Sequence, residues 1–285
     1  MGPVRRRRAA DPLRRGRRAA APRALESSRW HLGVPGGARD SHETVRAAAL
    51  REAAEEAGID PGSVRITGVH TDDHGGWSYA TVLAEPRVDI SPVSANTESV
   101  EVRWLPVPAV DQLPLHPGFA ATWPVVREAH PPAHLIVDAA NVVGSRPDGW
   151  WHKRLAAAQE LHDHLAVLAT TGLEPSSWPQ PGRFAGLSSG LEPGSWPQTD
   201  RVVGLSWLYP RVTMVVEGAA RPVTADARLH VVRAAGSGDD AIVDVVRAQP
   251  NGVVVTADRE LRQRVSALGA GVIGPRWLWA AITGG

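Results

Sequence analysis

Short apolar runs alternate with helical stretches in the second half of the chain. The runs "LIVD", "TMVV" and "VVVT" are continuous in apolar residues rather than alternating with polar ones. Strands of a parallel sheet have this pattern, because helices cover both of its faces. A helix is predicted from about Trp150 to Thr171. Residues 134–285 are therefore predicted to form an α/β domain with a mainly parallel sheet.

Residues 30–128 combine strand-like runs with one clearly marked helix. Asp40 is its predicted N-cap, with Glu43 three residues later as in a capping box. Gly58 supplies the C-terminal stop. The positions that would form its apolar face are Val45, Ala49, Leu50, Ala53 and Ala57. This pattern predicts a first α/β domain over residues 30–128, joined to the second by a linker at residues 129–133.

The N-terminal segment, residues 1–29, differs in composition from the rest. Nine arginines and one aspartate give residues 1–25 a charge of +8, so the other 260 residues carry −7 to reach the net charge of +1. With few large apolar residues, this segment is predicted to be a disordered tail, and a strand expected before "WHLGVPGG" is missing. Three interpretations remain open: a basic arm for nucleic acid, a tail on an impaired domain, or an artefact of the start or reading frame. The artefact is favoured, because GC-rich codons read out of frame give this composition.

The chain has no cysteine, which excludes disulfides and thiolate metal sites and favours a cytoplasmic location. No apolar run approaches the length of about 18 residues that spans a bilayer, so no membrane partner is expected. No apolar segment typical of a secretion signal follows the N-terminal arginines.

Three glutamates lie on one face of the predicted helix. Glu52, Glu55 and Glu56 are spaced i, i+3 and i+4, so a rigid helix directs their carboxylates toward one cluster. Mg²⁺ prefers carboxylate and water oxygens and neutralises the charge of a pyrophosphate linkage. The alternative is a solvated acidic face, since like charges at this spacing cost only about 0.2–0.5 kcal/mol per pair.

The full pattern decides between these readings. From Gly37, the chain reads glycine, five residues, Glu43, seven residues and then "REAAEEAGI". This resembles the Nudix box at every specified position. The resemblance implies an α/β/α sandwich with a mixed sheet and hydrolysis of a phosphoanhydride bond in nucleoside diphosphate derivatives, with Mg²⁺ or Mn²⁺ as cofactor. It also implies roles for individual residues. Glu52, Glu55 and Glu56 would bind metal and take part in catalysis, Arg51 would orient a carboxylate, and Gly37 would offer its carbonyl to the metal.

A second acidic set follows the predicted strands of the second domain. Its members are Asp138, Asn141, Asp239, Asp240 and Asp258. Because the carboxyl ends of parallel strands share one edge, these side chains are expected to converge there. The alternative is that the aspartates favour helix N-termini through the helix dipole, with Ser237 and Thr256 as caps.

The segments "VDAANVVG", "GSGDDAIV" and "TADREL" resemble the NYN branch of the PIN-like nucleases. The resemblance implies a Rossmann-like three-layer fold in which these acids bind Mg²⁺ or Mn²⁺ and the domain binds or cuts RNA. Glu217 is a further carboxylate near the same edge, without an assigned role. Basic residues beside Trp150 and Trp151 suit single-stranded RNA, and packing of these rings on the sheet is the alternative. The rival for the whole protein is a catalytically impaired, RNA-associated binding protein. No oligomeric state is predicted.

A tandem repeat interrupts the second domain. "GLEPSSWPQ" at residues 172–180 recurs as "GLEPGSWPQ" at residues 190–198. Residues 172–200 are rich in Pro, Gly and Ser and are predicted to be a low-complexity insertion in a surface loop. The alternative is a tryptophan-presenting peptide for a partner.

Overall fold

The computed structural model describes residues 18–21, 31–93, 102–129, 133–146, 153–179, 204–249 and 252–283. Of residues 18–21 it describes the backbone. Contacts divide the chain into two compact units that are discontinuous in sequence. The first unit comprises residues 1–64 and 86–123, and the second comprises residues 65–85 and 124–285. The units differ from the predicted domains chiefly in residues 65–85, which cluster with the second half of the chain.

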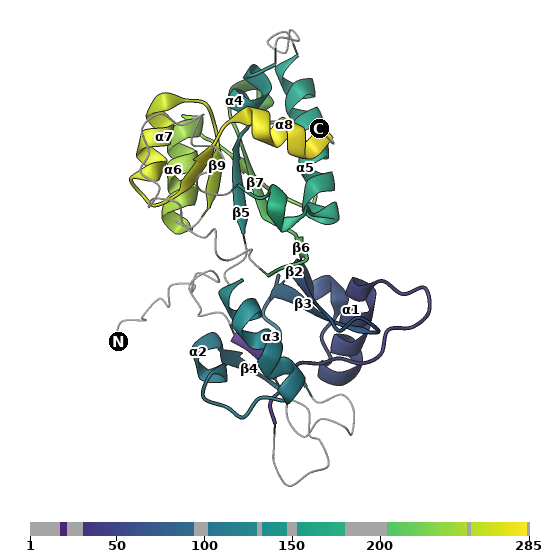
Figure 1. Cartoon of the computed structure of the whole chain (residues 1–285). Helices are drawn as coiled ribbons and strands as arrows, with labels where there is room; N and C mark the ends of the chain where they lie inside the picture. Colours follow the sequence, from purple (N-terminus) through teal and green to yellow (C-terminus); the bar gives the residue numbers. More distant parts are fainter. Residues whose placement is uncertain are drawn as a thin grey trace, which may run out of the picture. The chain divides into compact units, whose positions relative to one another are not determined.

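The second unit is built on a five-stranded parallel sheet (Figure 1). In spatial order its strands are β10 (Gly271–Ile273), β9 (Val253–Val255), β5 (His134–Asp138), β7 (Arg211–Val216) and β8 (His230–Arg233). Every neighbouring pair is parallel. All residues of β5 and β9 are buried, as expected for strands covered on both faces. The parallel sheet predicted from the apolar runs is confirmed.

Helices cover both faces of this sheet, as Figure 1 shows. On one side lie α4 (Ala139–Gly144), α5 (Arg154–Thr171) and α8 (Pro275–Thr283), and on the other lie α6 (Gly238–Ala248) and α7 (Arg259–Ser266). Successive residues of β5 pack into the hydrophobic cores on the two faces of the sheet. Leu135 and Val137 belong to the core under α4, α5 and α8, and Ile136 belongs to the core under α6 and α7. The helix predicted from about residue 150 corresponds to α5, which begins at Arg154.

Short polar side chains begin three of these helices. Asp138 caps α4, Ser237 caps α6 and Asp258 caps α7, each by accepting a backbone N–H of the first turn. The predicted capping role of Ser237 is confirmed. That of Thr256 is wrong, because Asp258 occupies the cap and the hydroxyl of Thr256 instead donates to Asp138 over 2.9 Å.

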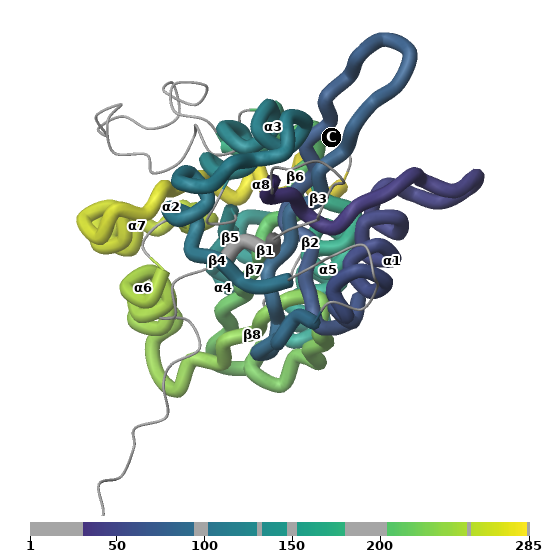
Figure 2. The backbone as a smooth tube through the Cα atoms, turned by 90° about the horizontal axis from the view of Figure 1, so that it is seen from below, coloured from purple at the N-terminus to yellow at the C-terminus, as the bar shows by residue number. Residues whose placement is uncertain are grey.

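A hairpin in the second unit forms part of a separate three-stranded sheet. The strands β2 (Val64–Asp73) and β3 (Ser78–Pro86) make the hairpin, and β6 (Trp207–Leu208) pairs antiparallel with β2 (Figure 2). The strands predicted to share one mixed Nudix sheet therefore lie in two sheets among the described residues, β3–β2–β6 and β1–β4. The physical reason for the difference is that a strand from far along the chain supplies the backbone partner of β2.

A partly buried ion triad holds the base of this hairpin. One carboxylate oxygen of Glu85, Oε1, accepts from Arg65 Nε and from Arg211 Nη2, both over 2.8 Å. Burial alone would raise the pKa of Glu85, but the two guanidinium charges and their hydrogen bonds outweigh burial and leave the pKa below its ordinary value. Nearby His134 is held neutral, because burial and the positive charges of Arg211 and Arg65 lower its pKa to about 3.

In the first unit, the glutamate-rich helix is α1 (Val45–Ala57). Its N-cap is Thr44, whose side chain accepts the N–H of Ala47, so the predicted cap at Asp40 is wrong. The side chain of Glu43 accepts the backbone N–H of Asp40, as in the predicted capping box, although the helix itself begins about one turn later than expected. The stop at Gly58 is confirmed, since its φ of 63° is a left-handed conformation that favours glycine.

The remaining elements of this region are β4 (Arg103–Pro106), α2 (Val107–Val110) and α3 (Pro117–Glu128). The buried apolar residues around them include Ala57, Ile59, Leu105, Val110, Phe119 and Trp123. The strand that sequence analysis found missing has a counterpart in β1 (Arg18–Ala21), which pairs antiparallel with β4. Sequence analysis missed it because "RAAA" has no apolar run, whereas ladder pairing uses backbone groups that every residue but proline supplies. The rest of residues 1–30, and residues 130–132 of the predicted linker, lie outside the described residues.

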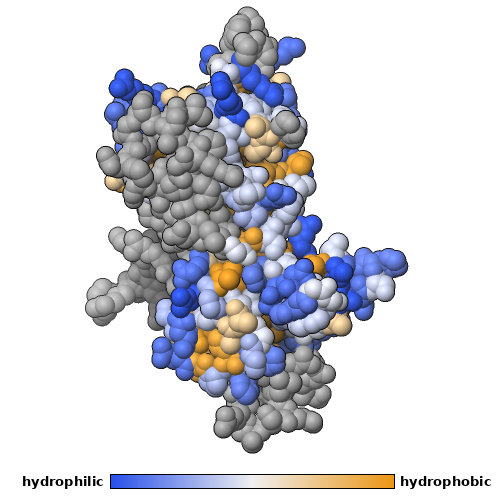
Figure 3. Space-filling view, viewed as in Figure 1, coloured by the Kyte–Doolittle hydropathy of each residue, from blue (hydrophilic) through white to orange (hydrophobic). Residues whose placement is uncertain are grey.

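Among the helices that the structure describes, none is both long and apolar enough to cross a membrane. Hydrophilic and hydrophobic side chains are interspersed on the face drawn in Figure 3.

Replacing Glu85 with glutamine tests the triad. The substitution keeps the shape but leaves two partly buried guanidinium groups without their anion, so we expect the free energy of unfolding at pH 7 to fall by about 3 kcal/mol. Since folding lowers the pKa of Glu85, its contribution is present above the ordinary carboxyl range and is lost as the pH falls through the folded value. Urea denaturation of both chains at pH 7 and at pH 3 should therefore show the difference shrinking in acid.

The matched control is Asp244→Asn. Asp244 pairs with Arg247, but both side chains are more than 60% exposed, so its loss should change stability by less than about 0.5 kcal/mol. A Glu85→Gln chain as stable as this control would show that the triad contributes nothing.

Candidate functional site

Arg51 is the centre of the Nudix-box residues on α1. Its Nε and Nη2 donate to the two oxygens of Glu43 over 3.2 and 3.1 Å, which makes a bidentate pair. Its Nη1 donates to Glu52 over 2.8 Å and to Glu55 over 3.2 Å. Nη2 also donates to the carbonyl of Ala38 over 3.1 Å, so one guanidinium ties the preceding loop to the helix.

The Gly36–Gly37 loop lies against the same glutamates. The N–H of Gly36 donates to Glu56 over 3.1 Å, and Glu56 is only 5% exposed. A Cβ at Gly37 would stand 2.3 Å from Oε1 of Glu52, so a larger residue at this position would displace that carboxylate. The loop and the helix therefore fix Glu52 and Glu56 together, whereas Glu55 is exposed.

Ion pairing in this cluster shifts the pKa values of Glu43 and Arg51. The hydrogen bond from Arg51 lowers the pKa of Glu43, and hydrogen bonds to Glu43 and Glu52 raise the pKa of Arg51. The repulsion expected among the box glutamates is thus partly offset by Arg51 itself. The sequence carried this signal, since Arg51 stands one residue before Glu52 and four before Glu55.

The oxygen atoms of this cluster suit a hard cation chemically. Carboxylates of Glu52, Glu55 and Glu56 and the carbonyl of Gly37 are the ligand types that Mg²⁺ takes. Among the described residues, no group of three or more His, Cys, Asp or Glu side chains already lies in an arrangement that could hold a metal ion. Arg51 occupies one oxygen each of Glu52 and Glu55, and Gly36 occupies one of Glu56.

The second acidic set is gathered at the carboxyl end of the parallel sheet. Asp138 is 8% exposed, and its two oxygens accept from the N–H of Asn141 over 3.1 Å and the hydroxyl of Thr256 over 2.9 Å. The amide oxygen of Asn141 accepts the N–H of Ala257 over 2.7 Å. These bonds join the end of β5 to the end of β9.

Glu217 is the residue that sequence reasoning left without a role. It follows β7 directly, and its carboxylate accepts the N–H of Gly238 over 2.6 Å at the start of α6. Its position after the buried run "TMVV" matches that of Asp138 after "LIV", which was the available signal.

Two carboxyl groups at this edge of the sheet, Asp138 and Asp239, have raised pKa values. Burial, with the negative charges of Asp239 and Glu217, raises the pKa of Asp138. Burial followed by the charge of Asp258 raises the pKa of Asp239. Asp240 is placed differently, because its carboxylate is ion-paired with Arg264 on α7.

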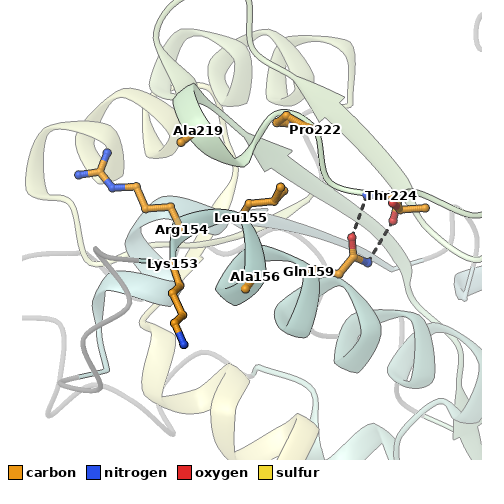
Figure 4. Close-up of a pocket in the computed structure, with 8 residues that line it drawn as sticks. All are labelled: Lys153, Arg154, Leu155, Ala156, Gln159, Ala219, Pro222 and Thr224. Carbon is orange, nitrogen blue, oxygen red and sulfur yellow. Dashed lines mark hydrogen bonds between the residues drawn. The ribbon is translucent and has the colours of Figure 1, made fainter.

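A cavity of about 830 Å³ lies between the start of α5 and the 3₁₀ turn η7 (Gly218–Ala220). Its lining residues are Lys153, Arg154, Leu155, Ala156, Gln159, Ala219, Pro222 and Thr224 (Figure 4). Leu155 is directed toward Pro222, whereas Lys153 and Arg154 diverge. Gln159 is fixed by two hydrogen bonds to the backbone of Thr224. The tryptophans considered for RNA stacking, at positions 150 and 151, lie outside the described residues.

Comparison with known families and proteins agrees with the geometry of the first site. Residues 13–128 of this chain match the NUDIX domain family. The match begins inside the segment assigned to the tail, includes β1, and ends at the predicted end of the first domain.

Two curated relatives are similar to about a third of the chain. "Putative 8-oxo-dGTP diphosphatase 3" of Mycobacterium tuberculosis is 47% identical over 103 residues, which are 34% of this chain and 47% of that protein. "Nucleoside triphosphate pyrophosphatase/Nudix hydrolase fusion protein" of Bifidobacterium longum is 37% identical over 103 residues, 35% of this chain and 21% of the relative. The chain thus spans less than half the length of each of these relatives.

Two solved structures are also similar. The Nudix hydrolase RenU from M. smegmatis shares 39% identity, with 38% of this chain and 72% of that chain covered and a TM-score of 0.35. Rae1 (YacP) from Bacillus subtilis, solved as a mutant, shares 17% identity over 52% of this chain and 74% of its own, with a TM-score of 0.34.

The coupling among the second set of carboxylates can be measured directly. Asp258→Asn keeps the helix cap, since Asn caps as well as Asp, but removes the neighbouring charge that most raises the pKa of Asp239. We expect the pKa of Asp239 to fall toward its ordinary value, as followed by carbon NMR titration of the carboxyl groups. Asp226→Asn is the control, because Asp226 is not among the groups that shift Asp239 and should leave its titration in place. An unchanged Asp239 titration in Asp258→Asn would show that the two are not coupled.

Proposed function

We propose that the NUDIX domain hydrolyses a phosphoanhydride bond of a nucleoside triphosphate or of a nucleoside diphosphate derivative, with Mg²⁺ or Mn²⁺ as cofactor. The observation that carries the proposal is the box geometry, in which Arg51 and the Gly36–Gly37 loop hold the glutamates together. The names of the two curated relatives, an 8-oxo-dGTP diphosphatase and a nucleoside triphosphate pyrophosphatase fusion, support this substrate class.

The residues of the Nudix box have different roles in this proposal. Glu52, Glu55, Glu56 and the Gly37 carbonyl would hold the cation, which neutralises the phosphates and lowers the pKa of a bound water. Arg51 would position Glu43 and Glu52, and its hydrogen bond lowers the pKa of Glu43. The small Gly36–Gly37 turn leaves the space that the Glu52 carboxylate occupies.

Glu56→Gln tests this assignment. Gln retains an oxygen that can accept the N–H of Gly36, and it is a comparable helix former, so the fold should persist. Loss of the charge removes a cation ligand, and we expect metal-dependent turnover to fall by about a hundredfold or more with little change in melting temperature. The release of pyrophosphate and of phosphate should both be followed with Mg²⁺ for a panel of nucleoside triphosphates and nucleoside diphosphate derivatives that includes 8-oxo-dGTP.

The control is Glu128→Gln, because Glu128 is exposed on α3 and pairs only with the adjacent Arg127 among the bonds described for its carboxylate. It should keep the wild-type rate. Full activity in Glu56→Gln would overturn the assignment, and an inactive wild type would favour the rival of an impaired binding protein.

A second function is favoured by the position of the carboxylates at the carboxyl end of the parallel sheet. We propose that Asp138, Glu217, Asp239 and Asp258, with Asn141 beside them, bind Mg²⁺ or Mn²⁺, and that this site acts on RNA. The support is that four carboxylates converge on one edge and that the pKa values of Asp138 and Asp239 are raised in part by neighbouring negative charges. A divalent cation would remove that repulsion.

Thermal unfolding tests this second site in the full-length Glu56→Gln chain, where the first site is disabled. Mn²⁺ at a hundredfold excess over its dissociation constant should stabilise the chain by about 2.7 kcal/mol. Asp138→Asn should abolish the metal effect without lowering the metal-free melting temperature, because it also removes repulsion. Asp226→Asn should retain it. A metal effect that survives Asp138→Asn contradicts the site, and single-stranded RNA left uncut by the metal-loaded chain contradicts the RNA activity.

A further inference from the structure

The first copy of the tandem repeat is a packed part of the second unit rather than a free loop. Leu173 exchanges two backbone hydrogen bonds of 2.9 Å with Leu208 in β6. Trp178 is 5% exposed and meets the ring of Trp277 edge to face, with 6.4 Å between the ring centroids. The indole N–H of Trp277 donates to the carbonyl of Ser177 over 3.1 Å. The segment therefore occupies a defined site between β6 and α8.

The repeated residue types are the ones this site requires. Gly172 has a φ of 70°, and a Cβ there would stand 2.5 Å from the carbonyl oxygen of Leu208. Pro175 begins the 3₁₀ turn η4 (Pro175–Ser177), which brings Trp178 to the core. Leu173 and Trp178 both belong to the larger core cluster. Glycine, leucine, proline and tryptophan at these spacings thus form a ligand motif for the site.

The second copy has every one of these residues. In the second copy, the residues that correspond to those packed in the site are Gly190, Leu191, Pro193, Ser195, Trp196 and Pro197. The nine-residue copies differ at one position, where Ser176 is replaced by Gly194. Ser176 is exposed and donates to Glu174 within its own turn, so the difference falls outside the buried surface. The second copy lies outside the described residues, but its sequence meets each requirement of the site.

The second copy also lies close in sequence to the next described segment. The repeat continues beyond the nine residues, because Gly186-Leu187-Ser188 recurs as Gly204-Leu205-Ser206. In the structure, Ser206 accepts the N–H of Thr71 and donates its own N–H to Val69, so this later segment is fixed on β2. Six residues separate Pro197 from Gly204, whereas 24 residues separate Pro179 from Gly204.

The cost of ordering the chain does not select one copy. The two copies are 18 residues apart in the sequence. If the second copy occupies the site, these 18 residues form a loop between α5 and the site instead of a loop after the site. Loop-closure entropy depends only weakly on loop length. Ser189 would then take the place of Thr171, whose carbonyl accepts the indole N–H of Trp207. Any residue can supply that carbonyl, so this contact is retained.

We propose that the site between β6 and α8 is a peptide-binding site for the motif Gly-Leu-Glu-Pro-x-Ser-Trp-Pro, and that residues 190–197 of the same chain are its second ligand. The two copies bind this site alternately. The repeat therefore provides a duplicate ligand for this site within one chain.

Tryptophan substitutions test the exchange through the melting temperature of the second unit in the full-length protein. Trp178→Ala and Trp178→Ala with Trp196→Ala are compared by calorimetry. Losing a buried tryptophan without replacement should lower the melting temperature by about 10 °C. We expect that loss only in the double variant. Trp178→Ala alone should lose less than about 3 °C, because the second copy takes the site, and Trp196→Ala alone should match the wild type.

Deleting residues 181–198 supplies the matched background. The deletion removes the second copy, keeps every described residue, and leaves six residues between Pro179 and Gly204. In that background Trp178→Ala should lose the full amount of about 10 °C. Ser176→Gly, which makes the first copy identical to the second, should leave the melting temperature unchanged. If Trp178→Ala costs as much as the double variant, or if the double variant costs nothing, the second copy is not a ligand for this site.

Discussion

The second unit depends on β5, a strand that is buried along its whole length between two neighbours that run in the same direction. The carboxyl ends of parallel strands lie at the same edge of a sheet. Asp138, Glu217 and the starts of α6 and α7 therefore lie at one edge. Asp138 then has three roles at once: it ends the strand, caps α4 and accepts the hydroxyl of Thr256. The strand that organises the hydrophobic core therefore also concentrates negative charge where the sheet meets solvent.

The first unit handles negative charge in another way. Its glutamates lie on one helix, and a single guanidinium within the same helix offsets part of their repulsion. In the second unit the carboxylates come from separate strands and loops, and burial together with neighbouring negative charges raises the pKa values of Asp138 and Asp239. In the first unit the positive charge that pairs with the glutamates is part of the same short sequence motif. In the second unit the carboxylates come from distant parts of the sequence and meet only when the sheet has formed.

Sequence reasoning succeeded where the signal is local or periodic. The parallel sheet follows from continuous apolar runs, and the end of α1 follows from Gly58. It failed where partners are distant or purely backbone. β1 has no apolar run, the choice of Thr44 over Asp40 as cap depends on one turn of helix, and the pairing of β2 with β6 joins segments about 140 residues apart. At the acidic edge, position after a buried strand identified Asp138 and equally marked Glu217, but nothing local shows that Asp240 turns to Arg264.

The long separation between β2 and β6 bears on the order in which the chain acquires its structure. The hairpin is complete once residue 86 has been made, yet the backbone groups on the outer edge of β2 meet β6 only after residue 208 has left the ribosome. A contact of such high sequence separation forms late. During synthesis the nascent chain carries an open strand edge for more than a hundred residues, and exposed edges recruit other strands. The ion triad at the base of the hairpin is likewise completed late, because Arg65 and Glu85 are made long before Arg211.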